Sequence, residues 1–170
     1  MGKTSLVATF CVVVLIAGTV PSAQSGSTAT AFPGAADKFD PSRDPVKDLA
    51  AAVVEAKRSH KRIILDVGGE WCSWCHILDR YFAAQPELTA ARDRSYVWLK
   101  INMSGENRNE AFLAKYPAIS GYPHLFVLEQ DGTLLHSQDT ALLEQGSSYN
   151  LDKMREFLTK WAPPAKVSSR

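Results

Sequence analysis

Cys72 and Cys75 are the residues of this chain best suited to chemistry, since two thiols separated by two residues can close and open a disulfide. They lie in the segment 70–76 (EWCSWCH), directly before apolar residues at helical spacing. A cysteine at a helix start is stabilised as a thiolate by free backbone N–H groups and the helix dipole. The pattern predicts that Cys72 attacks as the nucleophile and that Cys75, one turn later, resolves the mixed disulfide.

Two other uses of this motif are open from the residues alone. A structural zinc site needs about four ligands, and no second cysteine pair is present, so we expect no metal. The order Cys72-x-x-Cys75-His76 is also the pattern of covalent c-type haem attachment, with His76 and either Met103 or Met154 as axial ligands. The α/β pattern around the motif argues against haem, and a Soret band in protein from a haem-attaching host would overturn the thiol interpretation.

A buried strand and a helix are expected to hold the cysteines. Residues 62–67 (RIILDV) are apolar and β-branched, with charge before them and glycines after them, which predicts a strand buried on both faces. After the glycine turn, a helix is expected to start at the cysteines. Upstream, Asp44 and Pro45 have the residue types of an N-cap and a first helical position, and they open an amphipathic helix that ends near His60.

The rest of the pattern alternates helices and strands. We expect helices at 87–94, 107–116 and 151–161, strands at 96–101 and 124–128, and a hairpin through Asp131-Gly132 into a strand at 133–136. Strands that alternate with helices predict a largely parallel sheet covered on both faces, and the hairpin adds an antiparallel edge. The chain therefore has the pattern of a single α/β domain.

The N-terminus has the pattern of an export signal. Lys3, the uncharged run 6–20 and the small residues that follow predict a secretory signal peptide over 1–23. The run is shorter than the about 20 residues of a membrane span, so membrane contact is expected only if the segment stays uncleaved. We expect a flexible lead-in at 24–43, a domain at 44–162 and a tail at 163–170. Because no endoplasmic-reticulum retention signal ends the chain, export to a periplasm or secretion is expected.

Composition narrows the function classes further. The chain of 170 residues has 19 Lys and Arg against 18 Asp and Glu, and this balance argues against a nucleic-acid partner. Removing the predicted signal peptide removes Cys11 and leaves one cysteine pair. In an oxidising compartment a pair three positions apart closes too small a loop to staple the domain, so chemistry is the expected use. We expect the protein to act as a monomer.

Residues 64–75 (ILDVGGEWCSWC) resemble the thioredoxin active site, in which a buried aspartate lies six residues before the first cysteine of a Trp-Cys-x-x-Cys motif. Residues 121–123 (GYP) resemble the loop whose cis-proline faces the disulfide, and a strand and an Asp-Gly hairpin follow. The resemblance covers about 45–161 and is greatest to exported thioredoxin-like proteins of the thioredoxin-7 type. It implies a thioredoxin fold, a central mixed β-sheet flanked by helices.

The resemblance also implies roles for single residues. Asp66 corresponds to the buried acid that takes a proton from the resolving cysteine, and burial is expected to raise its pKa. Lys100 corresponds to a lysine near that acid, and Glu70 has a supporting place beside the motif. The pair Ser73-Trp74 replaces the Gly-Pro of thioredoxin, and because this dipeptide influences the reduction potential, the direction of electron flow is left open.

Substrate-binding residues follow from the same resemblance. Pro123 is expected to place the Tyr122 backbone beside the disulfide, where it pairs with an extended substrate. Trp71 is expected to shape the surface around the motif. Trp74 departs from the family pattern, and because it is bulky and apolar and expected on an exposed turn, it is expected to dock a partner. His76 is expected to be a solvated histidine on the helix face, and the alternative is that, when charged, it further stabilises the thiolate.

The leading hypothesis is an exported thiol:disulfide oxidoreductase that acts on protein thiols and disulfides, together with a redox partner, and needs no cofactor beyond its redox-active disulfide. The reducing or electron-relay direction is favoured because Asp66, Glu70, Trp71 and Lys100 resemble thioredoxin more than the strong oxidants. The alternative is a thioredoxin-fold binding or chaperone module with little turnover. Insulin reduction by the wild type and by Cys72→Ser separates the two hypotheses.

Overall fold

The computed structural model describes residues 1–2 and 37–164. The predicted signal peptide apart from its first two residues, most of the predicted lead-in and the end of the predicted tail lie outside the described residues. None of the helices in the described part of the chain has the length and apolar character that crossing a bilayer requires.

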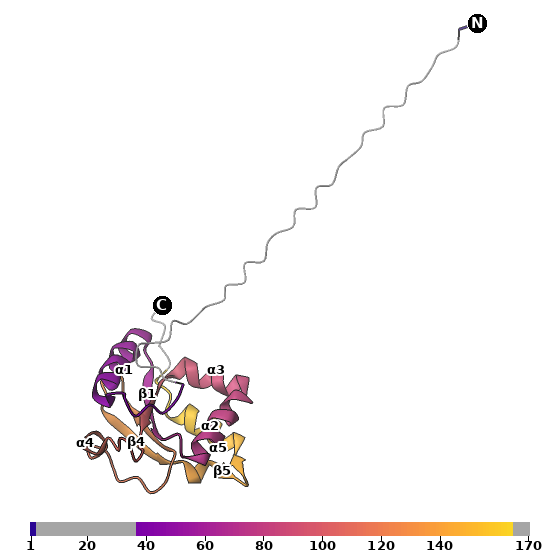
Figure 1. The fold of residues 1–170 in the computed structure, drawn as a ribbon. Helices are drawn as coiled ribbons and strands as arrows, with labels where there is room; N and C mark the ends of the chain where they lie inside the picture. Colours follow the sequence, from indigo (N-terminus) through magenta and orange to yellow (C-terminus); the bar gives the residue numbers. More distant parts are fainter. Residues whose placement is uncertain (3–36, 165–170) are drawn as a thin grey trace.

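A four-stranded sheet of order β2-β1-β3-β4 forms the centre of the fold (Figure 1). Its strands are β1 (Arg62–Gly68), β2 (Tyr96–Asn102), β3 (His124–Leu128) and β4 (Leu134–Asp139). β1 and β2 run parallel, whereas β3 is antiparallel to both β1 and β4. The mixed sheet implied by the family resemblance is confirmed. The expectation of a largely parallel sheet is wrong, because the chain between β2 and β3 returns on the other side of β1 in the opposite direction.

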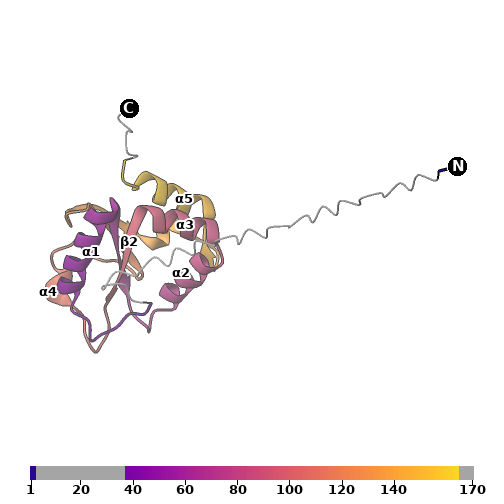
Figure 2. The ribbon, with the colours of Figure 1, turned by 90° about the horizontal axis from the view of Figure 1, so that it is seen from above.

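Helices cover both faces of the sheet (Figure 2). One face carries α1 (Pro45–Ser59) and the short α4 (Glu110–Leu113), and the other carries α2 (Ser73–Ala83), α3 (Pro86–Ser95) and α5 (Leu151–Lys160). The alternation of side chains along β1 explains the two layers. Ile63, Leu65 and Val67 pack in the cluster under α1, while Ile64 packs in the cluster under α2.

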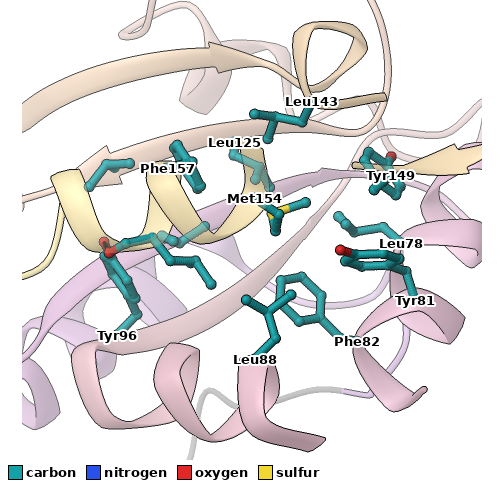
Figure 3. Close-up of a cluster of buried hydrophobic side chains, with 13 residues drawn as sticks. Leu78, Tyr81, Phe82, Leu88, Tyr96, Leu125, Leu143, Tyr149, Met154 and Phe157 are labelled. Carbon is teal, nitrogen blue, oxygen red and sulfur yellow. Dashed lines mark hydrogen bonds between the residues drawn. The ribbon is translucent and has the colours of Figure 1, made fainter. Parts of the chain in front are cut away.

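The cluster under α2, α3 and α5 holds the cysteine-bearing helix against the sheet (Figure 3). Leu78 and Phe82 of α2 point into it, as do Met154 and Phe157 of α5. Each fully buried side chain of this kind contributes about 1.5–3 kcal/mol. Because Cys75, Leu78 and Phe82 share one face of α2, the same packing sets the position of Cys75.

Most predicted elements are confirmed, but the helix expected at 107–116 is much shorter. α4 has only the four residues Glu110–Leu113, and Asn109 before it adopts the left-handed conformation, with φ 50°. Asn102 Nδ2 donates to the backbone oxygen of Asn107 at 2.7 Å, and Asn107 Oδ1 accepts from the backbone N–H of Asn109 at 3.1 Å. These asparagine contacts satisfy backbone groups locally and so compete with a helix.

Residues 140–149 form structure that the pattern did not predict. A 3₁₀ turn, η1 (Thr140–Leu143), leads into a two-stranded hairpin, β5 (Glu144–Gln145) and β6 (Ser148–Tyr149). Gly146 turns this hairpin with φ 60°, a conformation that glycine adopts without steric cost. Strands of two residues are too short to show an alternation of side chains.

The ordered domain begins before residue 44. The composition predicts a flexible lead-in at 24–43, yet Phe39 within it is only 2% exposed. Its backbone N–H donates to Glu70 Oε1 at 2.9 Å, and the backbone oxygen of Pro41 accepts from Asn107 Nδ2 at 2.8 Å. Phe39 is not part of a run of apolar residues at regular spacing, which explains why its packing was missed.

Candidate active site

The N-terminus of α2 carries a disulfide between Cys72 and Cys75, whose Cα atoms are 5.3 Å apart. Cys72 is the N-cap residue, and its Sγ accepts a hydrogen bond from the backbone N–H of Cys75 at 3.1 Å. The first turn of α2 contains no acidic residue. In the reduced state this position favours a thiolate at Cys72, because the free N–H groups and the helix dipole point at its sulfur.

Cys75 lies deeper than Cys72, against the end of β1. Cys72 is 3% exposed and Cys75 1%. A Cβ atom at Gly68 would collide with Cys75 Sγ and would also lie 3.0 Å from Cζ of the Phe39 ring. Only glycine, which has no side chain, allows Cys75 Sγ to approach β1 this closely.

Asp66 and Lys100 lie side by side in the sheet, beneath α2. They are register partners on β1 and β2, and Lys100 Nζ is 3.6 Å from Asp66 Oδ2. Asp66 is 1% exposed, and Trp98 Nε1 donates to its Oδ2 at 3.1 Å. Burial raises the pKa of Asp66, while Lys100 and the Trp98 hydrogen bond act in the opposite direction. Asp66 Oδ1 has no hydrogen-bond partner among the described residues.

Asp79 is a member of this group that the sequence did not reveal. It follows Cys75 by one turn on the same face of α2, and both of its oxygens accept from Lys100 Nζ, at 2.7 and 2.9 Å. Lys100 therefore bridges the buried carboxyl of Asp66 and the half-exposed carboxyl of Asp79. The negative charge of Asp79 also contributes to the raised pKa of Asp66. The four-residue spacing from Cys75 is the signal that could have found it.

Trp71 and Tyr122 form an aromatic pair next to the cysteines. Trp71 is 58% exposed, its ring meets that of Tyr122 edge-on with centroids 5.6 Å apart, and its Nε1 donates to the backbone oxygen of Met103 at 2.7 Å. The Tyr122–Pro123 peptide bond is cis, as the Gly-x-Pro pattern predicts. In the described part of the chain, no backbone hydrogen bond involves Tyr122, so its N–H and C=O are open to another strand.

Trp74 does not lie on an exposed turn, contrary to the expectation from sequence. It is half-buried, and its ring packs edge-on against Tyr149 with centroids 5.6 Å apart. Tyr149 belongs to the small hairpin that the sequence did not predict, which explains the error. Trp74 nevertheless packs against the cysteine pair together with Tyr122.

Glu70 connects the motif to two neighbours. Its carboxylate accepts from the backbone N–H of Phe39, and its backbone oxygen lies 2.8 Å from His76 Nε2. His76 is partly exposed and turns back to the residue before the motif. Across the described residues, no group of three or more His, Cys, Asp or Glu side chains is placed to hold a metal ion.

A mixed sheet, a Cys-x-x-Cys disulfide at a helix N-terminus and a cis-proline loop together define a thioredoxin-fold protein-disulfide oxidoreductase. The chain belongs to the thioredoxin-like family, whose model matches residues 44–129. This membership favours the dithiol interpretation of the motif over haem attachment. No curated protein matches the chain.

Solved structures share the fold. A disulphide isomerase from Xylella fastidiosa Temecula1 is 23% identical with a TM-score of 0.60, and the match covers 72% of this chain and 94% of that one. The C-terminal domain of DsbD from Neisseria meningitidis in its oxidised form is 25% identical with a TM-score of 0.53, over 73% and 98% of the two chains. Its reduced form is 26% identical with a TM-score of 0.52, over 69% and 96%.

Proposed function

We propose that this protein is an exported thiol:disulfide oxidoreductase that reduces disulfides in other proteins or relays electrons to them. The observation that carries the proposal is the position of Cys72 Sγ as the N-cap of α2, with Cys75 buried behind it against Gly68. One sulfur is thereby suited to attack and the other to resolve.

The reaction begins when the Cys72 thiolate attacks one sulfur of a substrate disulfide, which forms a mixed disulfide and releases the other substrate sulfur as a thiolate. The Cys75 thiol then transfers its proton to Asp66, and the Cys75 thiolate attacks the Cys72 sulfur. The Cys72–Cys75 disulfide forms, and the second substrate sulfur leaves as a thiolate. Two electrons pass to the substrate, and a donor protein with a dithiol restores the reduced pair by the reverse sequence.

The surroundings of Asp66 support its role as proton acceptor. A carboxyl whose pKa is raised by burial lies closer to the working pH, where proton transfer is most effective. Its Oδ1 is free of other hydrogen bonds among the described residues, and Lys100 stands beside its Oδ2. Asp66 lies two residues before Gly68 and so on the same face of β1 as the contact with Cys75.

The substrate is proposed to bind as an extended polypeptide. The open N–H and C=O of Tyr122 would pair with its backbone, in the manner of strand addition. Pro123 orients this loop, since its backbone oxygen accepts from Thr140 Oγ1 at 2.6 Å. Trp71 and the exposed part of Trp74 would contact substrate side chains, because aromatic residues dominate the energetics of such surfaces.

The reducing direction is supported by the resemblance of Asp66, Glu70, Trp71 and Lys100 to thioredoxin. The DsbD domain of Neisseria meningitidis is known in an oxidised and a reduced form, so a relative of this kind is stable in both states. Equilibration with glutathione measures the reduction potential, which determines the direction of electron flow. We expect a potential nearer to that of thioredoxin, about −270 mV, and a value near that of DsbA, about −120 mV, would refute the reductase.

Export is proposed from residues 1–23, whose charge and apolar pattern matches a signal peptide. Fractionation of the native host, with sequencing of the mature N-terminus, tests this proposal. We expect a periplasmic or secreted protein that begins shortly after residue 22, and an intact N-terminus in the cytoplasmic fraction would contradict it.

Trapping of the mixed disulfide tests the exchange itself. A Cys75→Ala variant retains the attacking sulfur and lacks the resolving one, so it is expected to accumulate disulfide-linked complexes with protein partners. Cys72→Ala is the matched control and should trap far less. Equal trapping by the two variants would contradict the assignment of Cys72 as the attacking residue.

A further inference from the structure

Phe39 is a buried aromatic residue of the segment 37–43, N-terminal to α1, and the mechanism above does not use it. It is 2% exposed, although it lies outside every helix and strand. Two atoms of its ring, Cζ and Cε1, lie 3.0 and 3.2 Å from the ideal Cβ position of Gly68, and Cys75 Sγ lies even closer to that position. The Phe39 ring therefore packs at the same point of β1 as the resolving sulfur.

The same ring also contacts the charged group beside Asp66. Lys100 Nζ lies 4.1 Å from the centroid of the Phe39 ring, within the range of a cation–π contact. One side chain thus covers both the sulfur that loses a proton and the cation next to the proposed acceptor, Asp66.

Two anchors hold the segment in place. The Phe39 backbone N–H donates to Glu70 Oε1 at 2.9 Å, which ties the segment to the turn before Cys72. Asn107 Nδ2 donates to the backbone oxygen of Pro41 at 2.8 Å, which ties it to the loop after β2.

Phe39 lines a hollow of about 340 Å³ together with Glu70 and Trp71. Water can fill a hollow of this size. Phe39 thus lines this hollow and also packs beside the sulfur of Cys75. Lys100 reaches a separate hollow of about 400 Å³, which Asp79 also lines.

We propose that Phe39 is a positioning residue for the resolving step: its ring keeps water in the adjoining hollow away from the Cys75 thiol, so that the thiol proton passes to Asp66. The inference rests on the proposed function. In this step the S–H bond of Cys75 breaks, its proton goes to the free Oδ1 of Asp66, and its electron pair attacks the Cys72 sulfur of the mixed disulfide. The bond to the substrate sulfur breaks, and the substrate leaves as a thiolate.

A thiol in dry surroundings ionises less readily and reacts more slowly with small reagents. The test therefore measures the rate at which iodoacetamide alkylates Cys75 at neutral pH, in the full chain with Cys72→Ser. Peptide mass spectrometry measures alkylation of Cys75 separately from alkylation of Cys11. We expect Phe39→Ala to accelerate this alkylation by about tenfold or more, because water and reagent then reach the sulfur.

Phe39→Leu is the matched control, because leucine restores an apolar cover without an aromatic ring. Its alkylation rate should stay within about threefold of the rate in the parent, the Cys72→Ser chain with Phe39 intact. The proposal is overturned if Phe39→Ala also stays within that range, or if Phe39→Leu is accelerated as much as Phe39→Ala. Near-ultraviolet circular dichroism at the assay temperature establishes that each variant is folded.

Two variants of Glu70 keep the test decisive if Phe39→Ala does not fold. Glu70→Ala retains the ring and removes its anchor, and it should accelerate alkylation of Cys75, whereas Glu70→Gln retains an oxygen acceptor and should restore the parent rate. Equal rates in Glu70→Ala and Glu70→Gln overturn the proposal.

Alkylation does not depend on turnover, so the two proposals fail separately. If the wild type, with both cysteines, reduces insulin but Phe39→Ala leaves alkylation of Cys75 unchanged in the Cys72→Ser chain, only the role of Phe39 is refuted. If the wild type fails to reduce insulin, the proposed function is refuted, whatever the alkylation rates are.

Discussion

Asp66 and Lys100 are register partners on adjacent parallel strands, and Lys100 Nζ lies 3.6 Å from Asp66 Oδ2 in a site that solvent hardly reaches. The same ammonium group lies 2.7 Å from Asp79 Oδ1 on the helix that carries the cysteines. The sheet and α2, the helix that carries Cys75, thus place two carboxyls around one cation. In the proposed mechanism, Asp66 is the acceptor for the proton of Cys75.

Replacement of the buried acid should slow resolution. Asp66→Asn removes the proton acceptor and keeps the size of the side chain, so turnover in insulin reduction is expected to fall by about 100-fold, the lower range for loss of a positioned base. Asp93→Asn, in an exposed part of α3, is the matched control and should retain the wild-type rate. Wild-type turnover in Asp66→Asn would exclude Asp66 as the acceptor.

The same substitution should change how stability depends on pH. Because burial raises the pKa of Asp66 in the folded state, its stabilising effect is complete below the unfolded pKa of about 3.9 and is lost as the pH rises through the folded pKa. Each pKa unit by which folding raises the pKa of Asp66 corresponds to about 1.4 kcal/mol of unfolding free energy. Urea unfolding of both proteins should therefore show Asp66→Asn gaining stability relative to the wild type from about pH 4 upward. A difference that is constant with pH would contradict the raised pKa.

Removal of the cation should shift the pH dependence of turnover. Lys100 lowers the pKa of Asp66, so Lys100→Met is expected to raise it further and to move the rising limb of the pH–rate profile to higher pH. Lys153→Met, at an exposed position of α5, should leave the profile where it is. The two profiles are compared in the same insulin assay, and coincident profiles would rule out coupling between Lys100 and Asp66.

A methyl group at the end of β1 should disturb the disulfide. The Cβ of Gly68→Ala would overlap Cys75 Sγ, so the domain is expected to lose about 1–3 kcal/mol of unfolding free energy through overpacking. Gly105→Ala is a suitable control, because nothing lies within 4 Å of its added Cβ. Urea unfolding measures both, and similar stability of the two variants would contradict the close approach of Cys75 to β1.

The sequence predicted the parts of the site that depend on strong local patterns. The apolar, β-branched run of β1 and the helix spacing after Cys75 placed the cysteines at a strand–helix junction, and the structure confirms this. Asp79 and Phe39 were missed because their contacts are with residues distant in sequence, such as Lys100 and Gly68, although the spacing of Asp79 from Cys75 was a usable signal. Such contacts leave no periodicity.

The errors have a similar origin. Trp74 was expected to be exposed because the hairpin that covers it has strands too short to predict. The sheet was expected to be largely parallel because a strand–helix–strand pattern does not show that α4 is one turn long and that the chain returns antiparallel to β1. Both features depend on how distant segments pack together.

Insulin reduction by the wild type and by Cys72→Ser, with a dithiol as electron donor, tests the central claim most directly. Serine keeps the N-cap of α2 but cannot form the mixed disulfide. We predict that the wild type accelerates the reduction and that Cys72→Ser performs no better than the donor alone. Equal acceleration by the two proteins would contradict thiol–disulfide exchange through Cys72.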